Sequence, residues 1–176
     1  MTHLLKFLIC YVVLSISAWA TEPSGAPILR LEAEMHTDTI WQISVDAEER
    51  FLLTASDDKT LRLWDLSTGE LITTYRIPIG NSFGGLEGKL YAGAISPNGE
   101  LVAGGGWTGY EWEQSQSIYL FNRITRKLVK RLYGLKKVIE HLCFSPDSQY
   151  LTASLAGGGI RIWETQNWEQ VFSDIH

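Results

Sequence analysis

The feature that most constrains the fold of this chain is an internal repeat with a period of 49 residues. Short segments of similar sequence recur at that spacing, and each follows an apolar stretch and a turn. They are Leu53-Thr54-Ala55-Ser56, Val102-Ala103-Gly104-Gly105 and Leu151-Thr152-Ala153-Ser154. Periods of about 20 to 50 residues are typical of stacked repeat proteins, because each repeat buries its apolar face only against its neighbours. The repeat therefore predicts stacked copies of one small unit.

Each unit has the pattern of four short antiparallel strands. Apolar and polar side chains alternate after the small-residue segment, and a period of two is typical of strands. These third strands are expected at Leu61–Asp65, Ile118–Asn122 and Ile160–Glu164. A polar turn then leads to a fourth and more polar strand, expected at Glu70–Tyr75, Lys127–Leu132 and Trp168–Phe172.

The pattern resembles the WD-repeat family, whose signature joins a Gly-His opening, a Ser-x-Asp turn and a Trp-Asp end. The first repeat carries this signature in His36, Ser56, Asp58, Trp64 and Asp65. The later repeats depart from it, with Gly85-Leu86, Gly134-Leu135, Phe121-Asn122 and Trp163-Glu164 at the corresponding places. The stretches Glu87–Ala92 and Gly104–Gly109 also look like bacterial multi-blade WD-repeat proteins, some of which carry a caspase-like domain.

The resemblance implies an all-β fold, a partial and open β-propeller of three four-stranded antiparallel blades plus one extra N-terminal strand. The expected divisions are a closing strand at 28–34, blade one at 35–75, blade two at 85–133, blade three at 134–172 and a tail at 173–176. Propellers close with about four to eight blades. Three blades therefore suggest a remnant of a longer gene, self-assembly that completes the ring, or a neighbouring protein that supplies the missing blades.

The first 20 residues have the pattern of a secretory signal peptide, with one Lys, the apolar run Phe7–Ile16 and small residues ending at Ala20. The apolar run is shorter than the roughly 20 residues that a membrane-spanning helix needs. We therefore expect cleavage after Ala20, a linker at 21–27, export to the periplasm or the cell exterior, and no membrane contact beyond the signal peptide. Cleavage leaves Cys143 as the only thiol, which excludes an intrachain disulfide.

The net charge of the chain excludes some classes of partner. The formal net charge of the chain is −5, and a net negative protein is repelled by polyanions. We therefore expect neither nucleic acid nor an anionic membrane surface as a partner.

The resemblance implies that His36, Ser56, Asp58 and Trp64 form a hydrogen-bonded brace with a structural role. Losing one partner of such a buried group costs about 1–3 kcal/mol. The serine is predicted inside a strand and the aspartate in a tight turn, which does not suit a hydrolase triad. We expect no enzymatic activity.

We expect no metal site and no cofactor. Glu140 and His141 are adjacent on a predicted strand, so their side chains point to opposite faces and cannot hold one ion together. Cys143 is expected to be a small buried core residue.

An insertion in blade two supplies the candidate partner-binding loop, Trp107, Tyr110, Glu111, Trp112 and Glu113. Gly105 and Phe121 are 16 residues apart, whereas Ser56 and Trp64 are 8 apart. Exposed aromatic residues within a polar rim are typical of binding hot spots, and the acids favour a basic peptide or protein, with carbohydrate stacking as the weaker alternative. The other interpretation is that this loop folds over and caps a blade that lacks its own brace. A second, Gly-rich insertion at 80–85 is expected on the same face.

These patterns predict a non-catalytic protein–protein interaction module or scaffold. Two alternatives remain open from the sequence. The chain could be the propeller front end of a larger enzyme or of a caspase-like protease system, or it could be a truncated product without a retained function.

Overall fold

The structure is a computed structural model that describes residues 34–78, 85–110 and 113–174. These residues belong to one compact unit, Ala33–His176. The predicted signal peptide, the linker and nearly all of the predicted closing strand at 28–34 lie outside the described residues, as does most of the Gly-rich insertion at 80–85.

The described residues form three four-stranded antiparallel sheets, as the repeat predicts, and contain no α-helix. Blade one holds β1 (Ile40–Val45), β2 (Phe51–Ser56), β3 (Thr60–Asp65) and β4 (Leu71–Arg76). Blade two holds β5 (Leu90–Ile95), β6 (Leu101–Gly106), β7 (Gln116–Asn122) and β8 (Leu128–Leu135). Blade three holds β9 (Ile139–Phe144), β10 (Tyr150–Leu155), β11 (Gly159–Glu164) and β12 (Gln170–Ser173).

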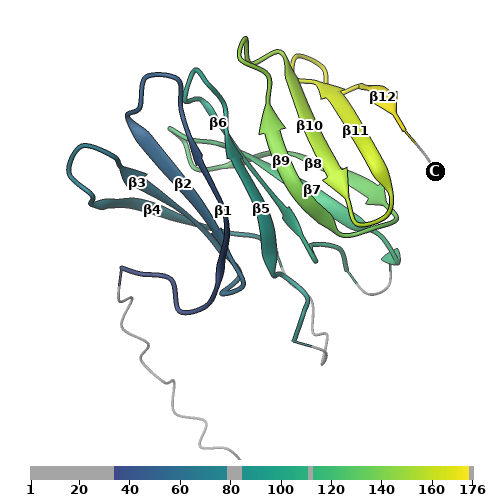
Figure 1. Cartoon of the computed structure of the whole chain (residues 1–176), viewed down its shortest axis with the longest axis horizontal. Coiled ribbons are helices and arrows are strands. Elements are labelled where there is room, and N and C mark those ends of the chain that lie inside the picture. The colour runs from purple at the N-terminus through teal and green to yellow at the C-terminus, as the bar shows by residue number, and fades with distance from the viewer. Residues whose placement is uncertain (1–33, 79–84, 111–112, 175–176) are drawn as a thin grey trace, which may run out of the picture. The chain divides into compact units, whose positions relative to one another are not determined.

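The sheets stack in chain order, with β5 between β1 and β9 (Figure 1). Two apolar clusters fill the two interfaces. Leu53, Leu61 and Leu63 of blade one pack against blade two, and Leu142, Leu151 and Trp163 of blade three pack against its other side. An open arrangement of three blades is therefore confirmed, and each blade contributes apolar side chains because a single sheet has too little surface to bury alone.

The strand register shifts the predicted alignment of the repeats by one residue. Thr54 lies opposite Arg62, Gly104 lies opposite Tyr119, and Ala153 lies opposite Arg161. The spacings between these equivalent positions are 50 and then 49 residues, so the equal spacing predicted from the short segments is wrong. Because side chains alternate between faces, a shift of one residue changes which side chains meet the neighbouring blade.

A pair of glycines lets blade two approach blade one closely. Gly93 and Gly104 lie opposite each other on β5 and β6. A Cβ atom at Gly104 would lie 2.6 Å from Cδ1 of Leu61, and one at Gly93 would lie 2.9 Å from Cβ of Ala55. Leu61 therefore occupies the space that side chains at these two positions would fill.

The expectation that Cys143 is buried is wrong, because its side chain is exposed. Cys143 lies opposite Thr152, at the place where blade two has Ala94 opposite Ala103. Ala94 is 1% exposed because blade three covers it. No described sheet covers the corresponding face of blade three.

Nothing in the described part of the chain is a helix long and apolar enough to cross a membrane.

Candidate functional site

A chain of hydrogen bonds joins His36, Thr54, Asp58 and Trp64 on the face of blade one that points away from blade two. Nε1 of Trp64 donates to Oγ1 of Thr54 at 2.9 Å, and Oγ1 of Thr54 lies 2.6 Å from Nε2 of His36. Nδ1 of His36 lies 2.8 Å from Oδ2 of Asp58. A carboxylate only accepts hydrogen bonds, so Nδ1 of His36 donates to Asp58, and Nε2 forms the hydrogen bond with the Thr54 hydroxyl.

Ser56, which the family resemblance places in the brace, lies beside this chain of hydrogen bonds rather than in it. Its Oγ donates to the Asp38 carbonyl at 3.2 Å and accepts from the Asp58 amide at 3.1 Å. Thr54 links His36 to Trp64, and it is not one of the four residues predicted for the brace. Thr54 and Ser56 share one face of β2, and Thr54 is the nearer to Trp64, which lies opposite Leu52. The register of β2 and β3 is the signal that identifies Thr54 as the linking residue.

The brace is buried and its polar atoms are engaged. The side chains of His36 and Asp58 are 3% and 5% exposed. Burial raises the pKa of the Asp58 carboxyl, but hydrogen bonds from Thr60, His36 and the Thr37 amide together hold that pKa below its ordinary value of 3.8. Because both ring nitrogens of His36 are bonded, the ring has no free base for chemistry. This arrangement suits a structural role.

The loop of blade two is anchored at its base. The amides of Thr108 and Gly109 donate to Oε1 of Gln116 at 2.7 and 2.9 Å, and the Thr108 hydroxyl donates to the Ser117 carbonyl. The Trp107 amide donates to the Lys89 carbonyl at 3.0 Å. The Trp107 side chain is 37% exposed. The loop therefore displays Trp107 on a fixed backbone.

Two other residues of the predicted loop contact Arg131 of β8. Glu113 forms a two-pronged ion pair with the Arg131 guanidinium, with a distance of 3.0 Å between Oε1 and Nη1. The guanidinium lies 5.1 Å from the centre of the Tyr110 ring, and its Nε donates to Oγ of Ser117 at 3.0 Å. The hydrogen bond from Arg131 holds the pKa of Glu113 below its ordinary value. Glu111 and Trp112 lie outside the described residues.

These contacts bear on both interpretations of the loop. Tyr110 and Glu113 fold back onto blade two, as a capping role requires, while Trp107 keeps a partly exposed face. The Glu113 charge is balanced by Arg131, which weakens the argument from the acids of this loop toward a basic partner.

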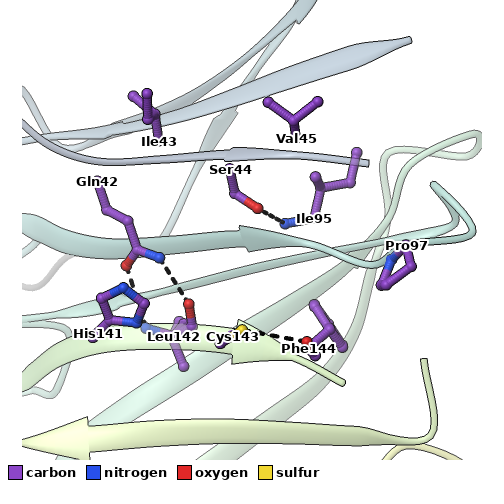
Figure 2. Close-up of a pocket in the computed structure, with 10 residues that line it drawn as sticks. All are labelled: Gln42, Ile43, Ser44, Val45, Ile95, Pro97, His141, Leu142, Cys143 and Phe144. Atoms are coloured by element: carbon purple, nitrogen blue, oxygen red, sulfur yellow. Dashed lines mark hydrogen bonds between the residues drawn. The ribbon is translucent and has the colours of Figure 1, made fainter. Parts of the chain in front are cut away.

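A cavity of about 220 Å³ lies among the inner strands β1, β5 and β9 (Figure 2). Gln42 spans its wall: Nε2 donates to the Leu142 carbonyl at 2.7 Å, and Oε1 accepts from the amides of Gly93 and Leu142 at 3.3 Å. Ile43 and Val45 point to the other side of β1 (Figure 2). Sites for small molecules usually measure about 300–1,000 Å³, so this cavity is smaller than such sites usually are.

The described residues contain no group of three His, Cys, Asp or Glu side chains that could hold a metal ion. His141 lines the inner cavity together with Cys143, and Glu140 is not among its lining residues.

The WD domain, G-beta repeat family matches residues 27–65 and 126–164. Both matches end one residue after a tryptophan of the third strand in a blade, Trp64 in blade one and Trp163 in blade three. Blade two, which carries the insertions, lies mostly between the two matches.

Three curated relatives are eukaryotic proteins of similar sequence. Periodic tryptophan protein 2 of Arabidopsis thaliana is 27% identical over 73% of this chain and 13% of that protein. Eukaryotic translation initiation factor 3 subunit I of Brugia malayi is 27% identical over 80% of this chain and 42% of that protein. Small ribosomal subunit protein RACK1 of Caenorhabditis elegans is 26% identical over 78% of this chain and 38% of that protein.

A solved structure of U3-55K has a similar fold, with a TM-score of 0.65 and 16% sequence identity over 81% of this chain and 41% of that one. This chain therefore spans less than half the length of these relatives. The predicted likeness to bacterial multi-blade proteins finds no support among them and stays a prediction.

Proposed function

Because this chain belongs to the WD-repeat family of β-propellers, we propose that it is a protein-interaction scaffold without chemistry of its own. WD-repeat propellers generally act as scaffolds. The polar groups of blade one that could suggest catalysis are bonded to one another within the brace. This use of His36 and Asp58 supports binding through surfaces over reaction at a site.

The anchored loop of blade two is the surface that we assign to partner contact. The observation that carries this assignment is the 37% exposed Trp107 side chain on a backbone held by Gln116, Ser117 and Lys89. A fixed aromatic residue loses little conformational entropy when a partner covers it, which is why tryptophan is frequent at binding hot spots.

Substitution of the loop tryptophans tests this proposal. The tagged 176-residue chain is used as bait in extracts of its own source, once unchanged and once as Trp107→Ala with Trp112→Ala. We expect the double variant to keep its urea midpoint and to lose the enriched proteins, because the aromatic contacts are gone while the loop anchors remain.

Tyr150→Ala is the matched control, since Tyr150 is also 37% exposed but lies on β10 of blade three. It should capture the same proteins as the unchanged chain. An identical set of captured proteins for all three baits would refute the loop as the contact surface.

We also propose that the chain is exported and that its signal peptide is removed after Ala20. The support is the apolar run Phe7–Ile16 followed by small residues. The mass of the protein recovered from the periplasm or the medium tests this. A protein that keeps Met1 and stays in the cytosol contradicts it.

Self-association is a further proposal about partners. Ile43 and Val45 are 63% and 41% exposed on β1 of blade one, on the side away from Gln42 and Ser44 (Figure 2). Apolar side chains on an uncovered sheet favour assembly. Sedimentation at micromolar concentration tests it, and a single monomeric species would contradict it.

A further inference from the structure

Positive charge is concentrated in one short segment of the chain. Seven of the 15 Lys and Arg residues lie between Arg123 and Lys137, and no Asp or Glu lies there. The rest of the chain holds eight basic and 20 acidic residues. The segment is therefore strongly basic within an acidic protein.

The structure places this segment at the outer edge of blade two, on β8 and its flanking turns (Figure 1). Two of its cations are engaged: Arg131 pairs with Glu113, and Arg123 donates to the Gly99 carbonyl at 2.5 Å. The other five form what we call the basic strip: Arg126, Lys127, Lys130, Lys136 and Lys137. All five are exposed, and none forms an ion pair with a carboxylate of residues 34–78, 85–110 or 113–174.

Exposed apolar side chains alternate with the cations along β8, so that Val129 and Tyr133 lie on one face of the strand and Lys130 lies on the other. Tyr133 is 77% exposed, the largest fraction for any large apolar side chain in the described part of the chain. Val129 and Leu128 on the same strand are 50% and 47% exposed. Tyrosine is enriched where proteins bind one another, and apolar patches within a polar rim mark such surfaces.

The equivalent strands of the other blades lack this charge. Lys130 lies opposite Leu120, at the register position where blade one has Thr73 opposite Leu63 and blade three has Phe172 opposite Ile162. Lysine on an edge strand commonly prevents unwanted strand pairing. That general need applies to all three outer strands, so it does not explain why only β8 meets it with so many cations.

We infer that the basic strip is a docking surface for an extended acidic segment of a partner protein, with apolar residues that cover Tyr133. This inference rests on the proposed scaffold function and names a partner class for it. A short acidic segment gains the attraction of the strip and avoids the acidic remainder of the chain. A long nucleic acid would extend over that remainder and be repelled.

Fluorescence anisotropy with a defined probe tests the inference. The probe is a short fluorescein-labelled peptide in which Glu alternates with Leu, and the protein is the 176-residue chain. Lys130→Thr with Lys136→Gln should weaken binding about fivefold at low salt, since two exposed ion pairs are lost. Binding should also weaken as the salt rises from about 0.05 to about 0.5 M.

Lys59→Gln with Arg76→Gln is the matched control, because it removes the same charge from blade one. It should bind the probe within about twofold of the unchanged chain. A strip variant that binds as tightly as this control overturns the inference, as does equal binding of a peptide with Gln in place of Glu. Tighter binding of polyuridine RNA, with displacement of the peptide, would assign the strip to nucleic acid and also overturn it.

The peptide-binding experiment tests the basic strip independently of the proposed scaffold function. Loss of peptide binding in the strip variant leaves capture through the Trp107 loop unchanged if both proposals hold. Failure of the peptide to bind, with capture through the loop intact, refutes the strip alone.

Discussion

Blade one and blade two use the same strand position in different ways. Thr54 in blade one points away from blade two and joins His36 to Trp64. Gly104, at the equivalent position in blade two, faces blade one, and the Leu61 side chain fills the space that a side chain at Gly104 would occupy. One position is held by a satisfied polar network and the other by close apolar packing. The difference shows that the repeat fold requires a filled and satisfied interface, and that the signature residues are one way of providing it.

At its rim, blade two has aromatic side chains and an ion pair in place of the brace of blade one. Its third strand has Tyr119 and Phe121 where blade one has Arg62 and Trp64. Arg131 and Glu113 then form an ion pair beside Tyr119, with the guanidinium 5.6 Å from the ring centre. The His36 and Asp58 side chains of the brace are buried, whereas the Arg131 and Glu113 side chains are 24% and 27% exposed. We therefore expect the brace to contribute more stability than the rim ion pair.

Gly104→Thr should have the largest effect, because it places the residue of blade one in the space that Leu61 fills in blade two. The new Cβ would lie 2.6 Å from Leu61, which is fully buried. Overpacking of this kind costs about 1–3 kcal/mol. We expect the free energy of unfolding, measured in urea, to fall by about 3 kcal/mol.

A double-mutant cycle with Leu61→Ala sharpens this test. Removing the Leu61 side chain opens the space that the threonine needs, so Gly104→Thr should cost much less in that background. An equal cost in both backgrounds would show that the glycine serves some purpose other than admitting Leu61.

Thr54→Val should have the next largest effect. Valine keeps the shape of threonine but leaves Nε1 of Trp64 and Nε2 of His36 without their partner, at a cost of about 2 kcal/mol. Thr54→Ser keeps the hydroxyl and should cost less than about 1 kcal/mol. Urea midpoints compare the two, and equal losses would mean that the methyl group matters more than the hydrogen bonds.

The free energy of unfolding should fall at acid pH, because Asp58 of blade one becomes protonated. The pKa of its carboxyl lies below the ordinary 3.8, because hydrogen bonds from Thr60 and His36 outweigh the effect of burial. The stability that this provides is present above about pH 4 and is lost as the pH falls through the lowered pKa.

Asp58→Asn provides the comparison for this pH dependence. The variant should be less stable at pH 7 and should lose less further stability between about pH 5 and pH 3, measured by urea unfolding. Parallel curves for the two proteins would mean that Asp58 does not couple folding to protonation.

The three four-stranded sheets could be predicted from the sequence because alternation and turn residues recur with the period. Strand register could not, since the small segments around Thr54 and Gly104 align equally well one residue apart. The link made by Thr54 was missed for that reason. Cys143 was misassigned because its neighbours Leu142 and Phe144 are apolar, and only stacking reveals which face of β9 lacks a neighbour.

The loop of blade two was predicted as an insertion by counting residues, yet the sequence could not show what its side chains touch. Arg131 lies 18 residues from Glu113 in the chain, and only the pairing of β7 with β8 brings the two side chains together. Trp107 keeps an exposed face that is consistent with the predicted hot spot.

Glu113→Gln should have the smallest effect, which makes it the sharpest test of the contrast between the two blades. An ion pair whose side chains are about a quarter exposed is screened by water and salt, so its loss should cost no more than about 1 kcal/mol. The cost should shrink at high salt, unlike that of Thr54→Val, because the hydrogen bonds of the brace are buried and salt screens them little.

Glu100→Gln is the control for Glu113→Gln, since Glu100 is an exposed acid of blade two that forms no ion pair with a described residue. It should leave the urea midpoint unchanged. A loss for Glu113→Gln as large as that for Thr54→Val, and insensitive to salt, would mean that the rim of blade two is held as firmly as the brace. The loop that carries Trp107 would then be a structural cap, because an ion pair of that strength would indicate that Glu113 is placed to close the blade.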